Sequence, residues 1–205
     1  MKKYRILILG ASYGSLLGIK LALAGHDVDL VCLPQEVELI NKEGAIVRLP
    51  IRDKDKVIEL RSTDCPGSLR ALGPTDVDIS TYDLIALAMQ EPQYGADEIA
   101  ELLKEIGLSK TPCMSIMNMP PLPYIARIEG LDTSKLDGAY TKPDVWKYFD
   151  SNYMTLCSPD PQAFRPPDEN INVLQVGLPT NFKAARFESD HHTQILRDLQ
   201  SDIEN

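Results

Sequence analysis

The chain has 205 residues and a formal net charge of −9. It is therefore long enough to bury one core, and its acidity argues against nucleic acid or an anionic membrane surface as a partner. No apolar segment is long enough to cross a bilayer, and the four cysteines form no C-x-x-C pair, so neither a metal site nor a disulfide framework is indicated. With no export signal, we expect a cytoplasmic protein.

The N-terminal segment carries the strongest pattern. An apolar run over residues 5–9 breaks at Gly10 and passes through small residues into a helical pattern over residues 14–24, and a second strand follows over residues 28–33. This is a βαβ unit, in which small turn residues let the backbone approach a diphosphate while the first helical N–H groups face it. We predict a dinucleotide diphosphate site made by Gly10, Ala11, Ser12, Tyr13, Gly14 and Ser15.

The turn matches the G-x-G-x-x-G fingerprint imperfectly, because Ser12 stands at the second glycine position and Ser15 at the third. A secretory signal peptide is the alternative interpretation, since residues 1–5 are basic and residues 22–24 resemble a cleavage site. The polar turn and Lys20 interrupt the apolar run, and a strand follows it. We therefore favour the βαβ unit.

Strand and helix patterns alternate as far as about residue 130. We expect helices over residues 35–42, 92–106 and 120–128 and strands over residues 45–49, 57–61, 82–88 and 112–117, with an irregular loop from residue 64 to 74. Continuous apolar strands between helices are typical of a parallel sheet covered on both faces. The pattern predicts an α/β fold with a Rossmann-like, doubly wound, mostly parallel sheet.

The C-terminal third is richer in proline. Residues 153–157, 173–177 and 182–187 read as antiparallel strands, and residues 190–203 read as a final helix. With no repeat and no low-complexity tract, we treat residues 1–205 as one dinucleotide-binding domain.

Ligands of an open parallel sheet bind beyond the carboxyl ends of its strands. Leu33 and Gln35 fall near one such end and are predicted near an adenosine ribose, whereas Gln90 and Asn118 are predicted near a nicotinamide. Met89 also lies at a strand end and is predicted to bind the cofactor. The Asn118 amide suits a carboxamide or a substrate hydroxyl, although it could equally cap the following helix. Gln90 could instead be a solvated loop residue.

Five segments resemble the N-terminal domain of the ketopantoate reductase (2-dehydropantoate 2-reductase) family. They are the glycine turn 10–15, the second strand 25–31, the strand 83–90, the strand end 115–120 and the region 172–181. The resemblance implies an oxidoreductase that transfers hydride between NADPH and a 2-oxo acid or related carbonyl. It also implies a family lysine where this chain has Gln90, and a helical second domain that carries the catalytic lysine and a substrate-binding acid. We expect that domain to be absent from this chain, and we assign no catalytic residue.

Several points stay open at this stage. The resemblance favours NADP, with NAD possible, but the second strand ends at Leu33 with neither an acid nor an arginine in place, and Glu36 could reach a ribose or simply serve as a helix N-terminal acid. Exposed apolar surface near Met117, Met119 and Leu122 would favour a homo-oligomer. The rival functions are an opine or hydroxyacid dehydrogenase-type cofactor domain and a non-catalytic dinucleotide-binding or scaffold domain.

Overall fold

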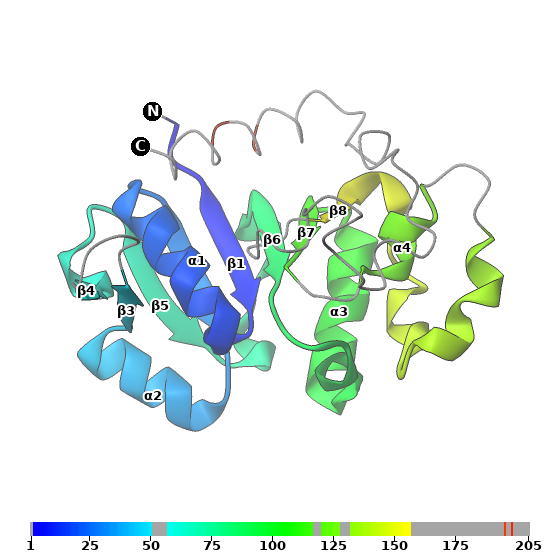
Figure 1. Cartoon of the computed structure of the whole chain (residues 1–205), viewed down its shortest axis with the longest axis horizontal. Coiled ribbons are helices and arrows are strands. Elements are labelled where there is room, and N and C mark those ends of the chain that lie inside the picture. Colours follow the sequence, from blue (N-terminus) through cyan, green and yellow to red (C-terminus); the bar gives the residue numbers. More distant parts are fainter. Residues whose placement is uncertain are drawn as a thin grey trace.

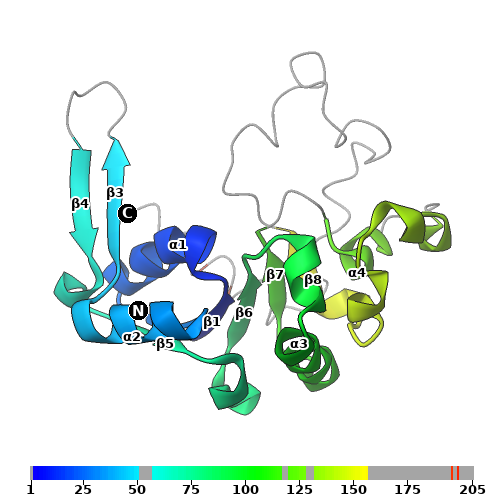
Figure 2. The same cartoon turned by 90° about the horizontal axis from the view of Figure 1, so that it is seen from below.

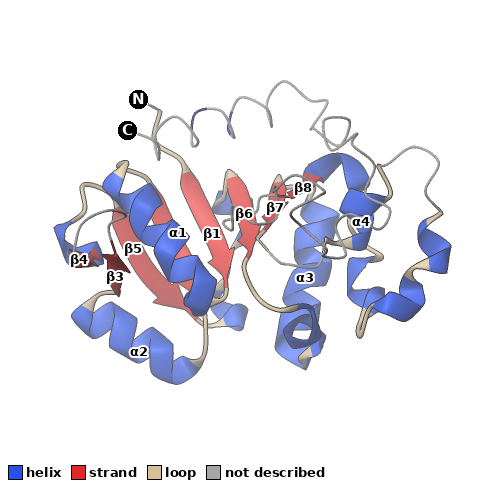
Figure 3. Cartoon of the chain, in the orientation of Figure 1, coloured by secondary structure: helices blue, strands red, loops and turns tan. Residues whose placement is uncertain are grey.

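In the computed structural model, which describes residues 2–50, 57–116, 120–127, 132–156, 195 and 198, six strands form one sheet (Figures 1 and 3). Their spatial order is β5-β2-β1-β6-β7-β8, and every neighbouring pair is parallel. The strands are β1 (Arg5–Leu9), β2 (Asp27–Val31), β5 (Ser68–Leu72), β6 (Leu84–Leu87), β7 (Cys113–Ser115) and β8 (Met154–Leu156). The order reverses between β1 and β6, as in doubly wound dinucleotide-binding sheets. The predicted Rossmann-like fold is confirmed.

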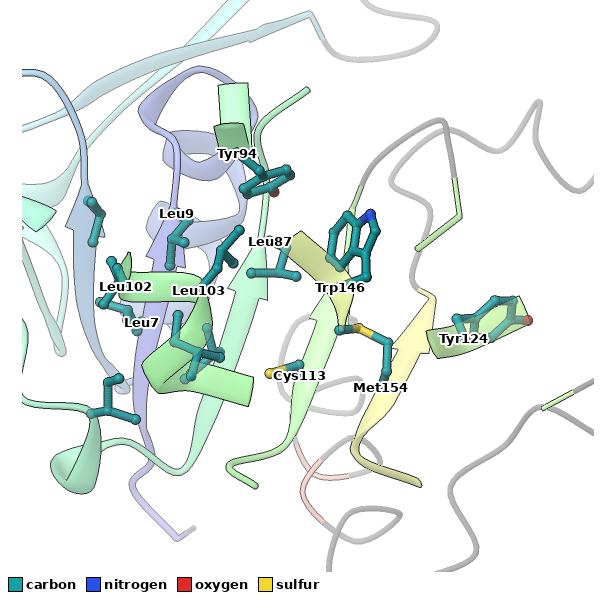
Figure 4. Close-up of a cluster of buried hydrophobic side chains, with 14 of the residues drawn as sticks. Leu7, Leu9, Leu87, Tyr94, Leu102, Leu103, Cys113, Tyr124, Trp146 and Met154 are labelled. Atoms are coloured by element: carbon teal, nitrogen blue, oxygen red, sulfur yellow. The ribbon is translucent and has the colours of Figure 1, made fainter. Parts of the chain in front are cut away.

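Helices cover both faces of the sheet. The α-helices are α1 (Ala11–Leu23), α2 (Pro34–Glu43), α3 (Asp97–Ser109) and α4 (Leu122–Ile125). Figure 2 shows α1 and α3 on opposite sides of the sheet. Because side chains alternate along a strand, Ile6 and Ile8 of β1 enter the core cluster on the α1 side, whereas Leu7 and Leu9 enter the cluster that packs against α3 (Figure 4).

Short 3-10 helices connect these elements. They are η1 (Ser62–Asp64), η2 (Pro74–Asp76), η3 (Ile79–Thr81), η4 (Glu91–Gly95), η5 (Thr133–Lys135), η6 (Asp137–Ala139), η7 (Pro143–Trp146) and η8 (Ser151–Tyr153). The helix predicted over residues 92–106 is thus divided into η4 and α3 by an extended Ala96. The helix predicted over residues 120–128 is reduced to the single turn of α4. No helix among the described residues is long and apolar enough to span a membrane.

The loop predicted over residues 64–74 is wrong, because this segment contains β5, the outer strand beside β2. Leu69 and Ala71 join the core on the α1 side, and the side-chain amide of Asn41 on α2 exchanges two hydrogen bonds of 2.8 Å with the backbone of Ala71. The strand lies between Pro66-Gly67 and Gly73-Pro74, whose turn-forming residues hid it in the sequence. Asn41 therefore occupies backbone groups that an edge strand would otherwise expose.

A separate antiparallel hairpin follows α2. Its strands are β3 (Ile46–Pro50) and β4 (Val57–Arg61), which confirms both strands predicted there. Figure 2 shows the hairpin extending away from the parallel sheet on the same side as α1.

The C-terminal third is described only in part. The strand predicted over residues 153–157 forms as β8, but the prediction that it is antiparallel is wrong, because β8 pairs parallel with β7. The strands predicted over residues 173–177 and 182–187 lie outside the described residues. Two helical residues of the predicted final helix are described. Ile195 is buried in the core on the α1 side, and Asp198 accepts a 2.6 Å hydrogen bond from the Tyr4 hydroxyl.

A buried carboxylate on β2 joins β5 and β1 on the α3 side. Asp29 on β2 is 4% exposed and accepts hydrogen bonds from Arg5 (3.0 Å), Arg70 (2.5 and 3.0 Å) and the Tyr82 hydroxyl (2.7 Å). Burial alone would raise the pKa of Asp29, but these donors outweigh it and the pKa is lowered. The charged form is thus part of the folded structure.

We expect Asp29→Asn to lower the free energy of unfolding by about 2–3 kcal/mol at pH 7, because it leaves two arginines without their buried partner. Since the folded pKa of Asp29 is lowered, its stabilisation is present above the unfolded value and disappears as the pH falls through the folded one. Urea denaturation of both proteins should therefore show a difference that shrinks below about pH 4.

The matched control is Asp27→Asn on the same strand, whose pair with Lys3 is solvent-exposed and should contribute less than about 1 kcal/mol. Equal losses of unfolding free energy in the two variants would show that the buried Asp29 contributes no more than an exposed ion pair.

Candidate dinucleotide site

Gly10 lies where the carboxyl ends of three strands converge. Its N–H donates to the Val31 carbonyl at 2.8 Å, and the N–H of Ala88 donates to the Leu9 carbonyl at 2.9 Å. Gly10 has φ +105°, and a Cβ placed there would lie 2.6 Å from Met89 Cγ and 2.9 Å from the Ala88 carbonyl oxygen. Only glycine fits this turn, because the conformation and the close approach to β6 both exclude a side chain. The turn stands at the point where strand order reverses.

Helix α1 starts at Ala11, directly after this glycine, and its N-terminus faces the same edge of the sheet (Figure 1). Gly10 provides no side-chain cap, and no acidic residue lies in the first turn. Within the described part of the chain, no hydrogen bond uses the backbone amides of Ala11, Ser12 or Tyr13. Three N–H groups at the positive end of a helix are therefore available to an anion.

The glycine spacing of this turn differs from the fingerprint. A Cβ on Gly14 would lie 2.7 Å from Ile8 Cγ2, and one on Gly18 would lie 2.9 Å from Leu69 Cδ1. Gly14 therefore provides the close helix–strand packing that the fingerprint assigns to its third glycine. Ser15, predicted at that position, instead donates its hydroxyl to the Ala11 carbonyl within α1 at 2.5 Å. Of the predicted diphosphate residues, Ala11, Ser12 and Tyr13 therefore offer backbone amides, whereas Gly14 packs the helix against the sheet.

The end of β2 leads directly into α2. Leu33 precedes α2, is 66% exposed and donates its N–H to Glu36 Oε2 at 3.1 Å, and Gln35 is exposed. Burial, and then the nearby Glu36 carboxylate, raise the pKa of the Cys32 thiol to about 11. The negative charge of Glu36 therefore disfavours a second negative charge at the end of β2.

The backbone after β6 is fixed by side chains of η4, the 3-10 helix that follows it. The Met89 N–H donates to the buried Tyr94 hydroxyl at 3.0 Å, and the Gln90 N–H donates to Gln93 Oε1 at 2.8 Å. Figure 4 shows Tyr94 beyond Leu9 and Leu87, past the ends of β1 and β6. Burial raises the pKa of Tyr94, so its hydroxyl stays neutral. The exposed Gln90 side chain is available to a ligand, whereas the backbone N–H groups of Met89 and Gln90 are both hydrogen-bonded.

The Glu91 side chain also holds the segment that follows β6 in place. It is 4% exposed, and its carboxylate accepts the backbone N–H groups of Thr141 (3.1 Å) and Lys142 (2.5 Å). It joins the end of β6 to the segment before η7 and is not placed to act as a free acid. Sequence reasoning missed both Glu91 and Tyr94, because only the fold shows that their partners are backbone amides.

The structure brings Met89 against the glycine turn and places Leu33 and Gln90 at the ends of their strands. Asn118, Met117 and Met119 lie outside the described residues, and Leu122 is partly buried against the core. His26 is buried, and its Nδ1 accepts the Tyr4 N–H at 3.3 Å.

No family model and no curated protein matches the chain. Solved structures do. A protein assigned as a ketopantoate reductase from Ralstonia solanacearum MolK2 aligns with a TM-score of 0.50 and 18% identity, covering 78% of this chain and 46% of that one. The chain shares its fold with ketopantoate reductases. It spans less than half the length of that relative.

Two further solved structures align with lower TM-scores. A protein assigned as a 2-dehydropantoate 2-reductase from Enterococcus faecalis has a TM-score of 0.43 at 22% identity, covering 74% of this chain and 40% of that one. A PanE/ApbA family ketopantoate reductase from Ralstonia eutropha JMP134 has a TM-score of 0.43 at 20% identity, covering 75% and 40%.

We expect Tyr94→Phe to free the Met89 amide, because the variant keeps the ring and removes only the acceptor. The free energy of unfolding should fall by about 1–2 kcal/mol, and hydrogen exchange at the Met89 amide should accelerate. Tyr13→Phe is the control, since the Tyr13 ring is 53% exposed and its hydroxyl has no partner among the described residues. An unchanged rate of hydrogen exchange at the Met89 amide in Tyr94→Phe would show that the Tyr94 hydroxyl does not protect this amide.

Proposed function

We propose that this chain binds a nicotinamide dinucleotide and serves as the cofactor domain of an oxidoreductase. The observation that carries the proposal is the set of three uncommitted amides, Ala11 to Tyr13, at the N-terminus of α1 and at the reversal point of the sheet. Backbone amides at a helix N-terminus bind phosphate without a cationic side chain, so an acidic protein can use them.

The residues present fit such a cofactor. Gly10 keeps its turn free of a side chain, so the backbone there can approach a diphosphate closely. Gly10 to Ser15 would hold the diphosphate, Leu33 and Gln35 would lie near the adenosine ribose, and Met89, Gln90 and Asn118 would lie near the nicotinamide. When bound in its reduced form, the cofactor supplies a hydride.

The reaction follows from the resemblance rather than from these residues. A 2-oxo acid or a related carbonyl is the proposed small-molecule substrate, as in a 2-dehydropantoate 2-reductase-like enzyme. Reduction of a carbonyl also needs a positioned proton donor, and we assign none within this chain. We propose that a helical domain or a second copy completes the site, and that the protein acts in the cytoplasm.

A non-catalytic dinucleotide-binding domain is the second candidate. Gln90 stands where the family has a lysine, and its exposed side chain offers hydrogen bonds but no positive charge. If the chain binds cofactor but reduces no 2-oxo acid when a helical partner domain is added, this candidate replaces the oxidoreductase.

The test is Ser12→Asp, which places a carboxylate beside the amides of the first turn. The charge should weaken NADH binding by at least about tenfold through repulsion of the diphosphate. The same charge complements the helix dipole, so the free energy of unfolding should stay constant or rise by about 0.3–1 kcal/mol. Calorimetric titration and urea denaturation measure the two effects.

Ser12→Asn is the uncharged control of the same size and should bind NADH more tightly than Ser12→Asp does. No saturable binding of NADH or NADPH to the unmodified chain would overturn the proposal, and so would equal affinities for Ser12→Asp and Ser12→Asn.

A further inference from the structure

The hairpin of β3 and β4 has one strand edge that faces away from the rest of the fold. Figure 2 shows β4 on the outer side of the hairpin, with β3 between it and α1. Beside the paired strands, the Ser62 N–H donates to the Ala45 carbonyl at 2.9 Å, so these residues form a hydrogen-bonded pair of the ladder. Hydrogen-bonded and non-hydrogen-bonded pairs alternate along an antiparallel ladder. The backbone groups of residues 57, 59 and 61 therefore point outward from β4.

This outer edge of β4 has no partner within the described part of the chain. No hydrogen bond there uses the backbone N–H groups of Val57, Glu59 or Arg61, and β4 pairs with β3 alone. By contrast, the side-chain amide of Asn41 covers the edge strand β5. Natural edge strands are protected by prolines or bulges, but β4 contains no proline and pairs with β3 in regular register. Such an edge can accept a further strand.

The side chains of the hairpin are suited to a second strand of the same kind. Val57 is 65% exposed and Ile58 is 42% exposed, so β4 presents apolar surface to solvent. Glu59 accepts hydrogen bonds from Arg48 Nε at 3.0 Å and from Arg61 Nη2 at 2.5 Å. These strands thus carry more arginine than carboxylate in a chain with a formal net charge of −9. A second copy is therefore repelled less at the hairpin than by the chain as a whole.

Charge selects one register for two β4 strands that pair antiparallel about a two-fold axis. With Glu59 opposite Arg61 of the second copy, opposite charges face each other twice and Leu60 faces Leu60 on the axis. Pairing Glu59 with Glu59 would place two carboxylates opposite each other, which is unfavourable. Pairing Glu59 with Val57 would leave the glutamate without an opposite charge across the interface.

We propose that β4 is an interaction surface through which two copies of this chain join their hairpins into one continuous antiparallel sheet. Glu59 of each copy lies opposite Arg61 of the other, and the outward backbone groups of these residues form the new hydrogen bonds. The added strands also support the hairpin, because an isolated two-stranded hairpin is marginally stable. The inference does not depend on dinucleotide binding.

Sedimentation equilibrium of the full 205-residue chain should show a reversible monomer–dimer equilibrium between micromolar and millimolar concentrations. Glu59→Pro removes one outward N–H and leaves the hydrogen bonds to β3 in place. Glu59→Ala is the matched control, since it removes the same side chain and keeps the N–H. Dimerisation of Glu59→Pro should be at least about tenfold weaker than that of Glu59→Ala. Far-UV circular dichroism checks that both variants are folded.

Leu60→Cys tests the register without removing a backbone group. Cysteines that face each other in a non-hydrogen-bonded pair lie at the separation a disulfide requires. Leu60→Cys should therefore form a disulfide-linked dimer under mild oxidation, whereas Ile58→Cys, on the same face of the strand, should not. The unmodified chain is the control for the four natural cysteines.

Four results would overturn the inference and leave the proposed dinucleotide site intact. The first is an unmodified chain that stays monomeric at every concentration, and the second is equal dimerisation of Glu59→Pro and Glu59→Ala. The third is a Leu60→Cys variant that forms no linked dimer, and the fourth is a dimer linked through Ile58→Cys.

Discussion

The approach of Gly10 to the end of β6 is the constraint on which the candidate site depends. The backbone of the turn lies against Ala88 and Met89 so closely that a single added carbon would collide with both. The same turn hydrogen-bonds to β2, so three strand ends are fixed together before α1 begins. The helix then starts without a cap and packs on the sheet through Gly14 and Gly18. Its N-terminal amides are therefore held rigidly at the edge of the sheet.

Three carboxylates near the sheet have different roles, and burial separates them. Asp29 is buried among two arginines and a tyrosine, and Glu91 is buried against two backbone amides. Their hydrogen-bonding capacity serves the fold. Glu36 is exposed and has one engaged oxygen, so of the three it is the carboxylate that a ligand can reach. Charge at the end of β2 thus comes from a helix residue and not from the strand itself.

The local sequence pattern was sufficient to predict the segments that bury continuous apolar runs. The apolar runs of β1, β6 and β7 and the position of Gly10 were predicted because strand burial and a tight turn leave direct traces in sequence. β5 was missed because its five residues lie between glycines and prolines, and its arginine pairs with Asp29, 41 residues away in the chain. The roles of Gly14, Tyr94 and Glu91 depend on tertiary contacts that no spacing rule contains. Asn118, a predicted site residue, lies outside the described residues and stays a prediction.

Nuclear magnetic resonance of the ¹⁵N-labelled chain during titration with NADH tests the central claim most directly, because it observes each backbone amide separately. The account predicts that the signals of Ala11, Ser12 and Tyr13 shift saturably and by more than those of the hairpin β3–β4. Signals of these three amides that stay unchanged while NADH binds elsewhere on the chain would contradict it.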